Sequence, residues 1–122
     1  MSYRILLVDD AQIIRFMLTR ILTAGGYEIA GEATNGHEAV EKYKQLQPDL
    51  VTMDITMPEM SGIEAVRAII KYDPKAKIIM CSALGQKNLI MEAIQAGACN
   101  FLIKPFQSDK VLAVVSSALS KK

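Results

Sequence analysis

The stretch LVTMDITMPEMSG, residues 50–62, decides the fold of this chain. Its first four residues form an apolar run that is typical of a short buried strand. Pro58 lacks a backbone donor and keeps Met57 out of the helical region, so the strand gives way to an irregular loop. Gly62 supplies conformational freedom just before the next helical pattern. Asp54 therefore stands where a buried strand ends, which in an open α/β sheet is the edge where ligands bind.

Four other stretches have strand character. Arg4–Val8 and Lys77–Cys81 are continuous apolar runs, which are typical of strands covered on both faces. Cys99–Ile103 is predicted to be a further strand, and Glu28–Ala33 alternates weakly, which predicts a shorter and more exposed one. A lone Asp between a strand and a helix is most often a turn or cap residue, so the meaning of Asp54 depends on how these strands are arranged.

Helical patterns separate the strands. Apolar residues recur at the spacing of an amphipathic helix over residues 12–23, 38–46, 63–70, 86–96 and from 108 onward. The residues predicted to face inward are Ile13, Ile14, Met17, Leu18, Ile21, Leu22, Ala39, Val40, Tyr43, Leu46, Ile63, Val66, Ile69, Ile70, Leu89, Ile90, Ala93, Ile94, Val111, Leu112, Val115 and Leu119.

The order of these elements predicts an α/β fold. Five strands that alternate with five helices indicate a parallel sheet with helices on both faces. Right-handed crossovers restrict the topology, and among the common doubly wound orders the flavodoxin-like order 2-1-3-4-5 suits five strands. In that order the first and third strands are neighbours where the winding reverses. The chain shows no internal repeat or linker, so we expect residues 1–122 to form one domain.

Composition excludes several function classes. The chain has 122 residues, of which 51% are apolar and 22% charged, and a net charge of +1, as is ordinary for a globular domain. The small net charge gives no argument for nucleic acid or an anionic membrane surface as a partner. No apolar run approaches the roughly 18 residues of a membrane span, and no secretory signal pattern is present. Cys81 and Cys99 lie in apolar stretches and are predicted to be small buried residues of a cytoplasmic protein, without a structural disulfide.

Polar residues follow the ends of four predicted strands. Asp9 and Asp10 follow the first strand, Asp54 the third, Ser82 the fourth and Lys104 the fifth. Taken singly, each has an ordinary alternative as a helix-start, turn or solvated surface residue. Because the carboxyl ends of parallel strands share one edge, the predicted topology brings three carboxylates, a hydroxyl and an ammonium to one crevice.

Such a group of charges favours a divalent cation and phosphoryl chemistry. Each carboxylate pair repels by on the order of 4 kcal/mol at about 4 Å if the effective dielectric constant is about 20, so the cluster needs a cation or raised pKa values. Oxygen ligands without a nearby His or Cys suit magnesium, which accepts few carboxylates and keeps waters for an anionic substrate. Lys104 and the cation would neutralise a transferring phosphoryl group, with Asp54 as the nucleophile that forms an acyl phosphate.

The motifs at these strand ends resemble the receiver domains of bacterial two-component response regulators. They are Val8-Asp9-Asp10, Asp54-x-x-Met57-Pro58-x-Met60-x-Gly62, Ser82-Ala83, Gly97-Ala98 and Lys104-Pro105-Phe106. Together these motifs span nearly the whole chain and are highly specific, whereas any one of them alone would be weak. Residues 52–62 and 93–106 look most like the single-domain chemotaxis regulators of that family.

The resemblance implies a role for each matching residue. It implies that Asp54 accepts a phosphoryl group from a histidine kinase. It also implies that Asp10 and Asp54 bind magnesium together with the main-chain carbonyl of Thr56, and that Asp9 acts largely through water. By the same resemblance Lys104 pairs with the phosphoryl group, and the peptide bond that follows Lys104 is expected to be cis.

A switch is also implied by the resemblance. Ser82 is expected to move toward the phosphoryl oxygen, and Phe101 to turn inward in response. The fourth helix, the fifth strand and the fifth helix would then present a changed surface to the target. The family often has Tyr where this chain has Phe101 and Thr where it has Ser82, so a switch in this chain can use ring packing but no phenol hydroxyl.

The implied function is that of a chemotaxis response regulator whose phosphorylated form binds the flagellar motor switch and controls rotation. The implied partners are a histidine kinase of chemotaxis type, a flagellar switch protein and, as a further candidate, a dedicated phosphatase. We expect a monomer without nucleic acid or membrane insertion. We expect no enzyme activity beyond the protein's own phosphoryl transfer and slow autodephosphorylation.

Three alternatives stay open at this point. A phosphorelay intermediate, which passes the phosphoryl group on to a phosphotransfer histidine, needs the same residues. A magnesium-dependent phosphatase with an Asp nucleophile would match Asp54-Ile55-Thr56 superficially, but it needs a general acid that Thr56 cannot supply. A flavin-binding module would place Ser, Thr or Gly after the first strand, where this chain has two carboxylates that repel phosphate.

Overall fold

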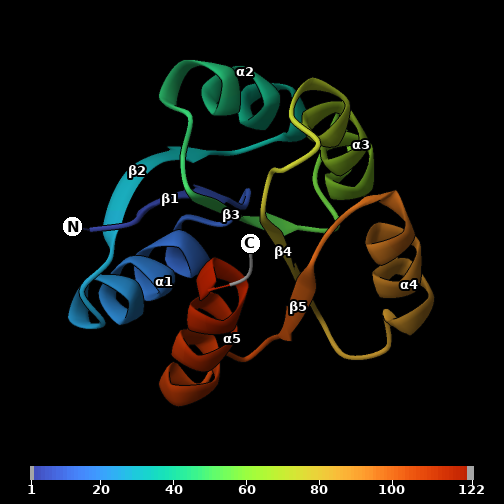
Figure 1. The fold of residues 1–122 in the computed structure, drawn as a ribbon. Coiled ribbons are helices and arrows are strands. Elements are labelled where there is room, and N and C mark those ends of the chain that lie inside the picture. The colour runs from blue at the N-terminus through green and yellow to red at the C-terminus, as the bar shows by residue number, and fades with distance from the viewer. Residues whose placement is uncertain (1, 121–122) are drawn as a thin grey trace.

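The predicted strands and their order are confirmed. The computed structural model describes residues 2–120, in which five strands form one parallel sheet of order β2-β1-β3-β4-β5 (Figure 1). The strands are β1 (Arg4–Val8), β2 (Glu28–Ala33), β3 (Leu50–Asp54), β4 (Ile78–Ser82) and β5 (Asn100–Ile103). That residues 1–122 form one domain stays a prediction, and residues 1 and 121–122 lie outside the described range.

Five helices connect and cover the strands. They are α1 (Gln12–Ala24), α2 (Gly36–Leu46), α3 (Gly62–Tyr72), α4 (Lys87–Ala96) and α5 (Ser108–Ser120). Helices α1 and α5 lie on one face of the sheet, and α2, α3 and α4 lie on the other (Figure 1). Within residues 2–120, every helix is too short or too polar to cross a lipid bilayer.

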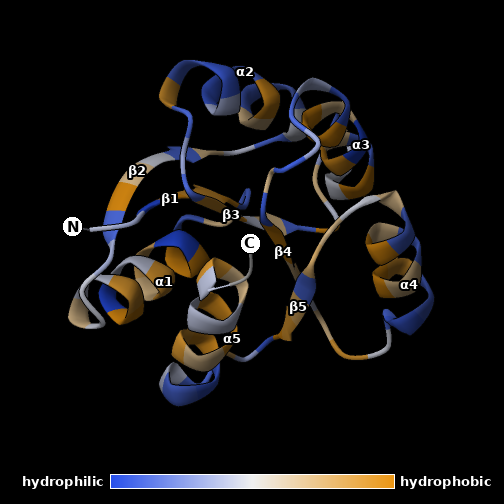
Figure 2. Cartoon of the chain, in the orientation of Figure 1, coloured by the Kyte–Doolittle hydropathy of each residue, from blue (hydrophilic) through white to orange (hydrophobic). Residues whose placement is uncertain are grey.

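The core consists of two apolar layers, one on each face of the sheet. Successive strand residues alternate between them, so that Ile5 and Leu7 pack on the side of α1 and α5 and Leu6 and Val8 on the side of α2 and α3. Figure 2 shows largely hydrophobic central strands, and helices in which hydrophobic and hydrophilic residues are mixed. Burial on both faces explains why the strands appear in the sequence as continuous apolar runs.

The edge strand β2 differs from its neighbours. It is more exposed than the central strands, as predicted, because it pairs only with β1. The prediction that it is also shorter was wrong, since β2 has 6 residues and β1 has 5. A strand at the edge of a sheet has fewer buried positions, so its sequence is less apolar, although the strand itself need not be shorter.

Several residues predicted to be inward are exposed. Ile13 is 63% exposed, Leu89 36% and Ile94 41%. Helices α1 and α4 bury a narrower row of residues than the predicted apolar stripe. In α4 the buried row consists of Ile90 and Ala93. Cys99 is also exposed, so the prediction that it is buried was wrong. It lies just before β5 and not within that strand.

The two cysteines form no disulfide in the structure. Cys81 is fully enclosed in β4, as predicted, and both thiols are free. Loss of solvation raises the pKa of the Cys81 thiol well above its usual range, so this side chain stays neutral and behaves as a small apolar residue.

Tyr43 ties the C-terminal ends of α2 and α3 together. Its hydroxyl donates to Asp73 Oδ2 at 2.8 Å, and the ring is 5% exposed. Tyr43→Phe is expected to lower the free energy of unfolding by about 1–2 kcal/mol, because it removes a hydrogen bond to a carboxylate. The matched control is Tyr72→Phe, since Tyr72 is 49% exposed, and it should change stability by less than about 0.5 kcal/mol. Equal midpoints of urea denaturation for the two variants would contradict this role of Tyr43.

Candidate functional site

The register of the sheet places polar residues side by side at its carboxyl edge. Strands β1 and β3 end in register, so that Asp9 lies next to Asp54. The pairing of β3 with β4 and of β4 with β5 extends to the ends of these strands, so Ser82 and Lys104 continue the row. The topology predicted from the sequence therefore produces the expected edge.

Three carboxylates and one ammonium meet at this edge. One oxygen from each of Asp9, Asp10 and Asp54 lies within 4.8 Å of the others. Lys104 Nζ lies 3.1 Å from Asp9 Oδ2 and 3.3 Å from Asp54 Oδ1. Asp9 and Asp54 are buried whereas Asp10 is exposed, so solvent reaches the cluster from the side of Asp10.

Burial and neighbouring charges together set the ionisation of Asp54 and Lys104. Loss of solvation raises the pKa of Asp54 to about 6, and the charge of Asp9 adds to this shift, although the ammonium of Lys104 opposes it. Burial alone would lower the pKa of Lys104, but the negative charges of Asp54 and Asp9 outweigh this effect, so the pKa of Lys104 is raised. One ammonium thus leaves residual repulsion among three carboxylates, which a proton or a divalent cation would relieve.

The two predicted switch residues differ in their surroundings. Ser82 is fully buried, and its Oγ has no hydrogen-bond partner within residues 2–120. A buried hydroxyl without a partner is unfavourable, so Ser82 is available to an acceptor that enters the site. Phe101 is 41% exposed, so the inward position expected for a phosphorylated form is not the position seen here. The Lys104–Pro105 peptide bond is cis, as predicted.

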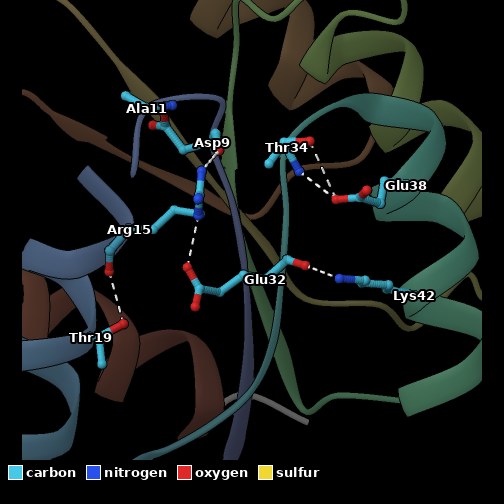
Figure 3. A network of polar contacts seen from close by, with 8 residues as sticks. All are labelled: Asp9, Ala11, Arg15, Thr19, Glu32, Thr34, Glu38 and Lys42. Atoms are coloured by element: carbon cyan, nitrogen blue, oxygen red, sulfur yellow. Dashed lines mark hydrogen bonds and ion pairs between the residues drawn. The ribbon is translucent and has the colours of Figure 1, made fainter. Parts of the chain in front are cut away.

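Arg15 is a supporting residue that the sequence reasoning missed. Its Nη1 donates to the main-chain carbonyl of Asp9 at 2.7 Å, and its Nε lies 2.7 Å from Glu32 Oε1 (Figure 3). The main-chain N–H of Ala11 donates to Asp9 Oδ1 at 2.9 Å, and Lys42 donates to the carbonyl of Glu32. Helix α1 and strand β2 therefore fix the peptide that follows Asp9. In the sequence Arg15 is one of several charged residues on an amphipathic helix, and no local pattern distinguishes it.

The loop after β3 is closed by main-chain bonds. The N–H of Ile55 donates to the carbonyl of Cys81 at 3.2 Å, and the N–H of Gly62 donates to the carbonyl of Ile55 at 2.8 Å. Thr56 is exposed, and its hydroxyl accepts a hydrogen bond from Gln86 Nε2 at 3.1 Å. Gln86 is the second residue that the sequence reasoning missed, because a Gln at the start of a helical pattern carries no specific signal.

The side chains at this edge fit a magnesium ion. The group that could hold a metal consists of three carboxylates, which offer the hard oxygen ligands that magnesium prefers. Asp10 is exposed, which leaves room for waters or an anionic substrate on the ion. The unpaired hydroxyl of Ser82 and the ammonium of Lys104 would face an anion bound there.

Comparison with known proteins agrees with this geometry. A family model described as "Response regulator receiver domain" matches residues 5–116. The chain is 62% identical over 112 residues to the chemotaxis protein CheY of Thermotoga maritima, an alignment that covers 92% of this chain and 93% of that protein. It is 55% identical over 120 residues to the chemotaxis protein CheY of Bacillus subtilis, with 98% and 100% covered.

Solved structures extend the likeness to three dimensions. The CheX-CheY-BeF3-Mg+2 complex from Borrelia burgdorferi contains a chain that matches with a TM-score of 0.93 and 41% identity, over 98% of this chain and 90% of that one. The response regulator domain of Thermotoga maritima CheB matches with a TM-score of 0.90 and 34% identity, over 100% and 99%. The chain therefore belongs to the response regulator receiver domain family, as a receiver domain of the CheY chemotaxis type.

Proposed function

We propose that this protein is a phosphorylatable chemotaxis regulator that takes a phosphoryl group on Asp54 from a histidine kinase. The observation that carries the proposal is the meeting of Asp9, Asp10 and Asp54 within 4.8 Å, with Lys104 Nζ 3.3 Å from Asp54. Receiver domains bind magnesium at an acidic pocket of this kind, and the Borrelia burgdorferi complex contains Mg+2 and BeF3. CheY-like receiver domains are signalling proteins, which supports a regulatory role.

The positions of the side chains support the following course for phosphoryl transfer. A carboxylate oxygen of Asp54 attacks the phosphorus of a phosphohistidine, the phosphorus–nitrogen bond breaks, and the imidazole nitrogen keeps the electron pair and takes a proton from solvent. Lys104 neutralises charge on the transferring group, and the hydroxyl of Ser82 donates to one of its oxygens. Magnesium, held by Asp10, Asp54 and the main-chain carbonyl of Thr56 and largely through water by Asp9, would supply further charge neutralisation when it is bound.

The output of the site would be a change of shape and of partner. A phosphoryl dianion on Asp54 would draw Ser82 toward it and allow Phe101 to turn inward, which changes the surface of α4, β5 and α5. In that form we propose that the protein binds the flagellar switch protein and controls rotation. The names of the Thermotoga maritima and Bacillus subtilis relatives support chemotaxis, and the CheX–CheY complex supports a further partner, which we propose to be a phosphatase.

The remaining assignments are also proposals. We propose that the protein acts in the cytoplasm as a monomer, and that it has no catalytic turnover beyond its own phosphorylation and slow autodephosphorylation. The net charge of +1 supports the proposal that nucleic acid is not a partner.

Mass spectrometry with acetyl phosphate and magnesium tests the phosphoacceptor. The wild type is expected to gain the mass of one phosphoryl group, and Asp54→Asn is expected to gain none, because the amide is not a nucleophile at neutral pH. The matched control is Asp109→Asn, which makes the same change at an exposed residue of α5 and should be phosphorylated like the wild type. Equal incorporation by wild type and Asp54→Asn would overturn the assignment.

Binding of a flagellar switch peptide tests the output. Beryllofluoride with magnesium is expected to raise the affinity for the peptide, because it mimics the phosphoryl group on Asp54. An unchanged affinity would count against a motor target. Rapid return of the phosphoryl group to a phosphotransfer histidine would favour a phosphorelay intermediate instead.

A further inference from the structure

The side chain of Gln86 joins the loop that follows Asp54 to the loop that follows β4. Its Nε2 donates to Thr56 Oγ1 at 3.1 Å, and its Oε1 accepts from the main-chain N–H of Ala83 at 2.7 Å. Thr56 lies two residues after Asp54, and Ala83 directly follows Ser82. One amide group therefore uses both its donor and its acceptor to tie the loop after β3 to the loop after β4.

Gln86 holds these loops instead of capping its own helix. It occupies the N-cap position of α4 but makes no side-chain cap bond, whereas Asn35 and Ser61 cap α2 and α3 with their side chains. Side chains at this position ordinarily accept from a helical N–H one turn ahead. Here the chain turns at Gly85, which has a φ of +90°, and the amide reaches back to Ala83. The first N–H groups of α4 thus lack the stabilising contact that the other two helices have.

The N–H of Ala83 lies just past the end of β4, the strand that pairs with β3 up to Asp54. Strands β3 and β4 pair up to Asp54, so the residues that follow β4 begin beside its carboxylate. Ser82 Oγ has no partner within residues 2–120, and the next main-chain donor along the chain is the N–H of Ala83. Successive donors of this kind, a hydroxyl and a main-chain N–H, are the usual ligands of phosphoryl oxygens. In this structure Gln86 Oε1 occupies the second of them.

We infer that Gln86 is a clamp whose amide oxygen takes the place of an anion oxygen on the Ala83 N–H. When an anion is bound at Asp54, it competes with Gln86 for that donor. Release of Gln86 then frees Thr56 and the start of α4 together. Gln86 is a positioning residue, because it acts through Ala83 and Thr56 and does not touch the reacting atoms. The inference rests on the proposed function, since it requires that Asp54 carry the anion.

Beryllofluoride binding at saturating magnesium tests the clamp, measured by isothermal titration calorimetry. Gln86→Leu keeps most of the side-chain volume and removes both hydrogen bonds, so its affinity is expected to exceed that of the wild type by about two- to tenfold, the range for one modest hydrogen bond. Gln86→Glu keeps an acceptor for the Ala83 N–H and adds a negative charge, so its affinity should fall below that of the wild type. Asn88→Ala, at an exposed residue of the same helical turn, should match the wild type.

Amide hydrogen exchange of Ala83, compared with and without beryllofluoride, gives a second readout, because a merely structural hydrogen bond from Gln86 would persist when beryllofluoride binds and the two proteins would then still differ. Without beryllofluoride, the Ala83 N–H should exchange faster in Gln86→Leu than in the wild type, and with it the two proteins should exchange alike. If the wild type binds and Gln86→Leu binds equally or more weakly, or if Ala83 exchange is unchanged, the clamp is overturned and the proposed function stands. Absence of binding by the wild type itself would overturn the proposed function and the clamp with it.

Discussion

Asp54→Asn is expected to raise the free energy of unfolding by about 2–3 kcal/mol at pH 7.5 in the absence of divalent cations, because each pKa unit corresponds to about 1.4 kcal/mol. Burial and the neighbouring charge of Asp9 raise the pKa of Asp54 from 3.8 to about 6. The ionised carboxylate is therefore less favourable in the folded protein than in the unfolded chain, and a neutral amide of the same shape relieves this cost. Urea denaturation of the two proteins measures the difference.

The sign of the pH dependence follows from the direction of this shift. A carboxyl group whose pKa is raised on folding binds its proton more tightly in the folded state, so its contribution to stability falls as the pH rises. The loss of stability caused by the ionised Asp54 carboxylate is absent below the unfolded pKa of 3.8 and complete above the folded pKa of about 6. The difference in the free energy of unfolding between Asp54→Asn and the wild type should therefore be small at pH 4, increase up to about pH 6 and then stay constant.

Magnesium and a matched variant provide the controls. Added magnesium should stabilise the wild type, because the ion binds only the folded state. Magnesium should therefore reduce the difference in the free energy of unfolding between Asp54→Asn and the wild type. Asp109→Asn removes an acid from the first turn of α5, and it should lower stability by less than about 1 kcal/mol. If Asp54→Asn proved less stable than the wild type at pH 7.5 without metal, the ion pair with Lys104 would outweigh the desolvation of the carboxylate.

Much of this site could be predicted from the sequence because its geometry follows from topology. Continuous apolar runs predicted buried parallel strands, and the strand order then required Asp9, Asp10, Asp54 and Lys104 to meet at one edge. The distances of 3.1 and 3.3 Å from Lys104 to two carboxylates agree with that expectation. Each of these residues lies at the end of a strand or within two residues of it, so no side-chain detail was needed to place it.

The missed features depend on contacts between distant residues. Arg15 and Glu32 are 17 positions apart, and Gln86 and Thr56 are 30 positions apart. Helical periodicity reports which face of a helix is apolar, but it does not report which polar side chain finds a partner across the fold. The exposure of Ile13 has a similar cause, because the width of the buried stripe depends on how closely a helix packs on the sheet. That distance is a tertiary property, which one segment of sequence does not encode.

Gly62→Ala is expected to lower the free energy of unfolding by about 3 kcal/mol or more, because the added methyl group would collide with the backbone that ends β3. A Cβ atom at Gly62 would lie 2.0 Å from the main-chain oxygen of Asp54 and 2.9 Å from the Cα of Ile55. Helix propensity predicts the opposite sign, since Gly62 is the first residue of α3 and Ala favours a helix over Gly by about 1 kcal/mol. The collision prevails because the atoms that must move belong to the backbone and not to a flexible side chain.

Gly26→Ala separates this collision from ordinary backbone strain. Gly26 has a φ of +92° and open space around it, so the substitution should cost only about 1–2 kcal/mol and leave the site unchanged. Gly62→Ala should in addition displace the carboxylate of Asp54, and a misplacement of about 1 Å can reduce a reaction rate on the order of a hundredfold. Phosphorylation by acetyl phosphate, measured below the unfolding temperature of both variants, should therefore be much slower in Gly62→Ala and normal in Gly26→Ala. Normal phosphorylation of a stable Gly62→Ala protein would show that the loop after β3 can move without disturbing Asp54.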